Sequence, residues 1–209
     1  SSLAIVGLVA LITSLRNLRE GTIDWAAVLW FGLPGVLGTY LGAYVSQFFP
    51  GWVQMAVFAV VMAIASVFMI RPLPAGGATA PQHGKGWVMI EGLLVGALTG
   101  FVGVGGGFVI VPALMILGGL SMMSAAASSL VIIAVKSAAG FIGYQQILFA
   151  TGQSLDWAVI TCFVGFGALG SWYGSVYAEG ADQARLQQWF GGGLILMATW
   201  ILWRTLLTS

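Results

Sequence analysis

Glycine is concentrated in one short stretch, GFVGVGGGFVIVPALMILGG, which occupies residues 100–119. Gly105, Gly106 and Gly107 are consecutive, and a helix that begins near Phe108 would present the amides of this run at its N-terminus. Unpaired N–H groups and the positive end of the helix dipole together favour a bound anion. The run therefore predicts an anion-binding site built from the backbone of these four residues.

A lysine lies in the middle of an apolar segment that extends over residues 122–147. A lysine at the centre of a membrane helix costs roughly 2.5–3.5 kcal/mol on insertion scales, so Lys136 should face a polar cavity or a partner. Ser129 precedes it by two helical turns and Gly140 follows by one, which places all three on one helical face. A cation, a hydroxyl and an open backbone suit a small anion. The alternative is a structural lysine that snorkels or pairs with a distant carboxylate.

The remaining acidic, cysteine and histidine side chains give weaker indications of a functional site. Glu91 lies early in its helix, where it either faces lipid headgroups or couples protons to transport. Asp24 and Asp156 each precede a tryptophan at a helix start and are expected to be N-caps. Cys162 is expected to be a small buried apolar residue, and His83 a solvated loop residue. We expect no metal site and no cofactor, and the absence of HExxH, GxSxG and Walker motifs argues against an enzyme.

The composition defines the environment of these residues. Of the 209 residues, 59% are hydrophobic and 6% are charged, and the mean hydropathy is +1.01. A soluble domain carries about 25% charged residues, so the chain is expected to be an all-α integral membrane protein. A net charge of +1 leaves no basic patch for nucleic acid.

Apolar segments of about 20 residues predict helices that cross a bilayer. We expect helices at 1–15, 25–49, 51–70, 87–103, 122–147, 155–178 and 182–207. The segment 108–117 is too short to span and is expected to form a half-helix with Pro112 in or near its first turn. Glycines and proline disfavour a continuous helix, so we expect a re-entrant or broken segment at 103–108.

The chain contains an internal repeat. Three short patterns recur in the same order in the two halves: residues 1–3 with 128–130, 23–26 with 155–158, and 35–38 with 167–170, and the last two patterns have the same spacing in both halves. A further glycine follows the last pattern in both halves, at Gly42 and Gly174. We expect these glycines to let helices pack closely, as in small-xxx-small seams; the full set is Gly38, Gly42, Gly92, Gly96, Gly100, Gly170 and Gly174. We divide the chain into a first repeat (1–70), a cytoplasmic linker (71–86) and a second repeat (87–209). Residues 87–127 have no counterpart before Ser1, so we expect the first repeat to be N-terminally truncated.

The distribution of arginine indicates how the two halves are oriented. Arg16 and Arg19 follow the first helix of repeat one, whereas the matching loop of repeat two has no cation; Arg185 shows the opposite pattern. Positive residues favour the cytoplasmic side, so the halves are expected to be inverted relative to each other. This arrangement places five cations inside: Arg16, Arg19, Arg71, Lys85 and Arg185. Parallel halves give the same charge total, so the total alone does not decide.

Two longer patterns resemble a known family. GFVGVGGGFVIVPALMILG followed by AAASSLVIIAVKSAAG is similar to the signature of the sulfite exporter TauE/SafE family, and so is LREGTIDW followed by GVLGTYLGAYVS. The resemblance covers nearly the whole chain. It implies a polytopic transporter of small sulfur-containing anions such as sulfite, sulfonates or sulfoacetate. Family members usually carry two glycine runs, and this sequence shows the second of them.

These observations predict a secondary transporter in the cytoplasmic membrane that exports a small anion by alternating access. Its expected partners are the anion and the lipid bilayer, and exposed glycine faces make a homodimer a further expectation. Two alternatives stay open. One is a non-transporting assembly or sensor module whose glycine seams serve helix packing. The other is a channel.

Overall fold

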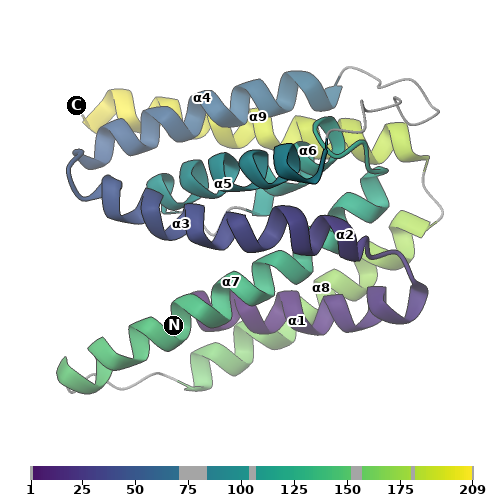
Figure 1. The fold of residues 1–209 in the computed structure, drawn as a ribbon, viewed down its shortest axis with the longest axis horizontal. Coiled ribbons are helices and arrows are strands. Elements are labelled where there is room, and N and C mark those ends of the chain that lie inside the picture. Colours follow the sequence, from purple (N-terminus) through teal and green to yellow (C-terminus); the bar gives the residue numbers. More distant parts are fainter. Residues whose placement is uncertain (1, 71–83, 104–106, 152–156, 180–181, 209) are drawn as a thin grey trace.

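The computed structural model describes residues 2–70, 84–103, 107–151, 157–179 and 182–208, and these residues form helices joined by short connections (Figure 1). In chain order they are α1 (Ser2–Glu20), α2 (Trp25–Ala27), the π-helical turn η1 (Val28–Gly32), α3 (Leu33–Ser46), α4 (Gly51–Ile70), α5 (Lys85–Val102), α6 (Gly107–Ile116), α7 (Met122–Thr151), α8 (Trp157–Glu179) and α9 (Gln183–Thr208). The predicted all-α architecture is confirmed for the described residues, none of which lies in a strand.

Each predicted helix is present, and the boundaries differ by a few residues. The largest shift at the start of the chain is in α1, which continues to Glu20 instead of ending near residue 15. Arg16 and Glu20 are one helical turn apart and form an ion pair of 2.8 Å, which supports the extra turn. The helix then ends at Gly21, whose φ of 66° is the left-handed conformation that glycine adopts without strain.

Four stretches within the described residues are long and apolar enough to cross a membrane: Trp25–Ser46, Gly51–Ile70, Met122–Ala139 and Trp157–Ser175. The protein is therefore a multi-pass membrane protein. α1 ends, α4 ends and α9 begins on the same side of the molecule (Figure 1). This places the arginines of α1 and α9 at one end, as the charge pattern led us to expect.

Helices from the two repeats pack against each other. α1 packs along α7, α4 packs along α9, and α3 of the first repeat packs along α5 of the second (Figure 1). In the first two pairs, each helix contacts the element that holds the corresponding place in the other repeat. The pairing is compatible with two related halves, and both the repeats and their inverted orientation stay predictions.

The short helix α6 lies in the centre of the molecule, between α4 and α7. Residues 109–115 are all buried, and Ile110 and Leu114 are at the middle of the main hydrophobic cluster. A helix that is hydrophobic all round is expected in such a buried position. Pro112 is inside α6, so its predicted place in the first turn is wrong. Because α6 begins at Gly107, the missing N–H of Pro112 leaves the carbonyl of Phe108 without its helical partner.

The predicted interruption of the helix over 87–117 is present. α5 ends at Val102, and Gly103 follows it with a φ of 73°. The amide of Gly103 donates to the carbonyl oxygens of Thr99 and Gly100 at 3.1 and 3.2 Å, which closes the last turn of α5. α6 then begins at Gly107, while Gly105 and Gly106 lie outside the described residues. A re-entrant path through the membrane stays a prediction.

Candidate functional site

Lys136 is half-buried on α7 and extends toward α3. A β-carbon built at Gly35 of α3 would lie 3.6 Å from Lys136 Nζ, 3.7 Å from its Cε and 3.2 Å from the carbonyl oxygen of Gly92 on α5. Because position 35 is a glycine, there is room for the Lys136 side chain at the place where α3 crosses α5. Among the residues that the structure describes, no carboxylate forms an ion pair with Lys136.

The beginning of α6 lies close to the same part of α7. A β-carbon at Gly107 would lie 2.7 Å from Ile133 Cδ1, so the α6 backbone packs directly on that side chain. Ile133 precedes Lys136 by one helical turn. The structure thus brings two predicted site residues, Gly107 and Lys136, to adjacent turns of α7.

Phe108 is anchored by its ring. The ring packs edge-to-face on Phe58 of α4, with centroids 4.8 Å apart and an interplanar angle of 80°. It also touches both hydrophobic clusters of the protein. Because the side chain is committed to the core, the backbone amide is the group that Phe108 can offer to a ligand at the start of α6.

Ser129 was predicted to bind the anion, but its hydroxyl forms a hydrogen bond within α7. Ser129 is 2% exposed, and its hydroxyl donates to the carbonyl oxygen of Ala126 at 2.8 Å. In this conformation its proton is already used, so donation to an anion requires the hydroxyl to rotate. The adjacent Ser128 holds the start of α2, because its hydroxyl accepts from the amide of Asp24 at 2.9 Å. Asp24 itself accepts from the amide of Ala27 at 3.0 Å, which confirms the N-cap predicted there. Asp156, the other predicted N-cap, and the predicted loop residue His83 lie outside the described residues.

Glu91 points into the protein. It is 8% exposed, and it shares a face of α5 with Val88 and Val95, which both pack in the main hydrophobic cluster. The alternative in which Glu91 faces lipid headgroups is therefore wrong. Its Oε2 atom is buried and has no hydrogen-bond partner. A buried carboxyl oxygen without a hydrogen-bond partner is costly, so this position needs an explanation beyond helix packing.

A second buried polar group escaped the sequence reasoning. Gln187, near the start of α9, is 6% exposed, and its Nε2 atom has no hydrogen-bond partner. One turn later Gly191 packs against Met69 and Ile70 at the end of α4, which explains why this side of α9 is buried. A glutamine in the first turns of a helix is typical of an interface with water, so the sequence carried no signal of its burial.

The glycines of α3 and α5 serve close packing, as predicted. A β-carbon at Gly38 would lie 2.1 Å from the carbonyl oxygen of Leu93, and one at Gly42 would lie 2.0 Å from that of Ala97. Such distances leave no room for any side chain. The same prediction is not met by the described contacts of α8. Gly170 and Gly174 have no neighbour within 4 Å of a β-carbon. Cys162 of α8 is exposed, so the prediction that it is buried is wrong.

Comparison with known proteins gives a consistent result. The profile of the family described as Sulfite exporter TauE/SafE matches residues 1–201. A "Probable membrane transporter protein" of Xylella fastidiosa (strain 9a5c) is 30% identical over 197 residues, which cover 89% of this chain and 72% of the relative. The "Probable membrane transporter protein y4hK" of Sinorhizobium fredii is 26% identical over 184 residues, which cover 85% of this chain and 72% of the relative. No solved structure matches the chain significantly.

Proposed function

Because this chain belongs to the sulfite exporter TauE/SafE family and is a membrane transporter rather than an enzyme, we propose that it exports small sulfur-containing anions such as sulfite, sulfonates or sulfoacetate. The proposed mode is secondary transport by alternating access. Sulfite and the sulfonates share a compact, negatively charged group with several oxygen acceptors. A site for them needs N–H donors and a balancing positive charge.

The observation that carries the proposal is the place of Lys136. Its ammonium lies within the protein where α3 crosses α5, and no carboxylate of the described residues neutralises it. A membrane protein gains nothing in stability from such a charge. A bound anion would supply the missing counter-charge, and a hydrogen bond to a charged group contributes about 1.5–3 kcal/mol.

The amides at the start of α6 are the proposed second half of the site. α6 begins one helical turn of α7 away from Lys136, and its first N–H groups have no partners within the helix. We assign anion contacts to the backbone of Gly105, Gly106, Gly107 and Phe108. Ser129 is assigned an auxiliary contact that forms when its hydroxyl releases the carbonyl of Ala126.

Glu91 is the proposed proton-coupling residue. Its buried Oε2 lacks a partner, and its neighbour Gly92 packs at the same helix crossing that Lys136 reaches. Protonation would then accompany one direction of the transport cycle, and deprotonation the other.

The proposed alternating access uses the two related halves. Transporters built from inverted repeats expose a central site first to one side and then to the other as one unit moves against the other. The contacts of α1 with α7, of α4 with α9 and of α3 with α5 join the two repeats, so these are the interfaces at which such a movement would occur.

One observation favours the second candidate, a non-transporting module. The glycines of α3 and α5 do pack the two helices together, as that candidate requires. It gives no reason, however, for a lysine at this crossing or for the buried, partnerless carboxyl oxygen of Glu91 on α5.

Transport in proteoliposomes tests the proposal. The purified protein is reconstituted, and uptake of radiolabelled sulfite, sulfoacetate and sulfate is measured with and without a pH gradient. We expect saturable uptake and counterflow of at least one sulfur anion, since both are properties of a carrier. Non-saturable flux without counterflow would indicate a channel. No flux of any of the three, in liposomes where the protein is folded and correctly inserted, would favour the non-transporting module.

A further inference from the structure

A groove of about 590 Å³ lies along the crossing between α3 and α5, and we call it the α3–α5 groove. Its two walls are Leu29, Leu33 and Leu37 on η1 and α3, and Met89 and Leu93 on α5. Within each wall these residues are four apart, so each wall is one helical face. All residues that line the groove are apolar or aromatic, and its volume is within the range of about 300–1,000 Å³ that is typical of ligand sites.

The glycines of the crossing explain why a groove forms there. The backbones of η1 and α3 touch α5 at Gly92, Gly96 and Gly100, where no side chain would fit. The larger side chains that flank this seam stand apart and leave a concave surface between them. Because two helices in backbone contact cannot approach further, the protein does not close the groove itself. An empty groove would forfeit van der Waals contacts along both walls.

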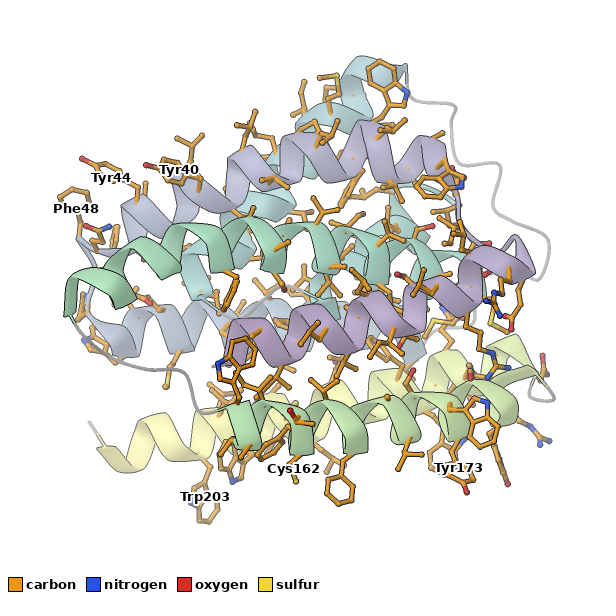
Figure 2. The ribbon with its side chains drawn as sticks, turned by 90° about the horizontal axis from the view of Figure 1, so that it is seen from below. Tyr40, Tyr44, Phe48, Cys162, Tyr173 and Trp203 are labelled. Atoms are coloured by element: carbon orange, nitrogen blue, oxygen red, sulfur yellow. The ribbon has the colours of Figure 1, made fainter. Side chains whose placement is uncertain are left out.

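The groove opens toward the hydrocarbon of the bilayer. Leu33 and Leu37 are exposed, and they belong to the stretch Trp25–Ser46, which is long and apolar enough to cross a membrane. Tyr40 and Tyr44 continue the same face of α3, and Figure 2 shows both pointing away from the neighbouring helices. The occupant of the groove is therefore a component of the hydrocarbon layer.

The level of the groove suits a chain that descends from the membrane surface. The glycine contacts of α5 with η1 and α3 keep a constant offset, so these helices run in the same direction. Trp25 and Trp87, at the starts of α2 and α5, are therefore at about the same level, and both are exposed. Exposed tryptophans are typical of the membrane–water interface. Leu29 and Met89, where the groove begins, follow them by four and two residues, so the groove extends inward from the interface.

The width of the groove argues against a helix as its occupant. Leu29 and Leu37 are eight residues apart, which is about 12 Å along a helix axis. A volume of about 590 Å³ over this length corresponds to a channel about 8 Å across. A helix with its side chains is about 10–12 Å across. A hydrocarbon chain is much thinner and bends to follow the walls.

We propose that the α3–α5 groove binds an acyl chain of a membrane phospholipid. The headgroup lies at the level of Trp25 and Trp87, and the chain packs between the two walls. Pro34 lines the groove, and the next residue, Gly35, is the one whose β-carbon position is 3.6 Å from Lys136 Nζ. The bound chain thus supports the same crossing that Lys136 reaches from α7. The proposal does not depend on the proposed anion site.

A photoreactive residue in the groove tests the proposal. Trp30 lines the groove, and Trp30→benzoylphenylalanine replaces one aromatic side chain by another of similar size. The matched control is Trp203→benzoylphenylalanine on α9, since Trp203 is exposed and points away from the other helices (Figure 2). Each variant is incubated with dioleoylphosphatidylglycerol, washed in dodecyl maltoside, irradiated and analysed by mass spectrometry. We expect a phospholipid adduct at position 30 and detergent adducts at position 203.

A substitution that fills the groove locates the lipid. Leu33→Trp adds a ring inside the groove, whereas Leu41→Trp adds the same ring two turns further along α3, beyond the groove. The two leucines are similarly exposed, at 57% and 53%, so Leu41→Trp is the matched control. In the variant with the photoreactive residue at position 30, Leu33→Trp should reduce the phospholipid adduct to the level at position 203. Leu41→Trp should leave it unchanged.

Four results of these experiments would overturn the proposal. Equal phospholipid adducts at positions 30 and 203 would mean that the lipid is ordinary bilayer lipid. An adduct that survives Leu33→Trp would place the lipid outside the groove. Detergent adducts alone at position 30 would show that no phospholipid is held there. A covalent dimer formed through position 30 would make the groove an interface between two copies of the chain.

Thermal unfolding gives an independent measurement. In detergent, added dioleoylphosphatidylglycerol should raise the Tm of the wild type and of Leu41→Trp, since a ligand that binds the native state stabilises it. This rise should be lost in Leu33→Trp, whose own side chain fills the groove. That variant should still fold, because position 33 is exposed. An equal rise in all three proteins would contradict a lipid site in the groove.

Discussion

Replacing Lys136 by methionine separates the two roles that a buried lysine can have. Methionine has nearly the length of the lysine side chain, so it fills the space beside Gly35, where Nζ and Cε lie 3.6 and 3.7 Å from a β-carbon position. Among the described residues no carboxylate pairs with Lys136, so the substitution breaks no ion pair. It also removes an insertion cost of roughly 2.5–3.5 kcal/mol. The variant should therefore fold, with a Tm equal to or above that of the wild type.

Substrate binding should nevertheless fall severely. The lost contact with a charged group is worth about 1.5–3 kcal/mol, which raises Kd roughly ten- to hundredfold. At a substrate concentration of about 100 times the wild-type Kd, ligand stabilises the native state by about 2.7 kcal/mol. In the variant the same concentration is about 1–10 times Kd, and the stabilisation falls to about 0.4–1.4 kcal/mol.

The assay is the Tm in detergent with and without sulfite, sulfoacetate or sulfate. Val135→Met is the control, since Val135 is the preceding residue and is 47% exposed on the outer side of α7. The control should keep the full substrate-induced rise in Tm, and Lys136→Met should lose most of it. A normal rise in Lys136→Met would refute the proposed site and identify Lys136 as a structural cation.

Three further substitutions test other parts of the structure. Gly42→Ala should lower the free energy of unfolding by about 1–3 kcal/mol, because its β-carbon would lie 2.0 Å from the carbonyl oxygen of Ala97, whereas Gly193→Ala should be neutral or stabilising in the same melting assay. Glu91→Gln should keep or raise Tm, since a neutral amide replaces a partnerless buried carboxyl group, and it should abolish the dependence of anion flux on a pH gradient; an unchanged dependence would remove Glu91 from the coupling. Asp24→Ala should cost about 1 kcal/mol in denaturant unfolding through loss of the N-cap, and Asp24→Asn should restore most of it, so equal losses in both would point to another role for the carboxylate.

The sequence by itself determined the helices, their order and the interruption between α5 and α6. Hydropathy and length decide which segments cross a membrane, and these are local properties of the chain. The break followed from glycine and proline, whose effect on helix stability is also local. The N-cap at Asp24 was predictable because the capping side chain and the amide it accepts from are three residues apart. The extra turn of α1 and the interior place of Pro112 were missed, since helix ends depend on side-chain pairs and backbone continuity beyond the apolar pattern.

Only the tertiary structure decided which face of each helix meets protein. The glycines of α3 and α8 match by sequence repeat, yet Gly38 touches the backbone of α5 while Gly170 meets nothing. Glu91 and Gln187 are buried because α5 and α9 turn those sides toward other helices, and in an apolar chain no hydrophobic periodicity marks the protein-facing side. Lys136 could be identified from its charge alone. Its place beside Gly35 follows from the crossing of α3, α5 and α7, whose contacting residues are far apart in the chain.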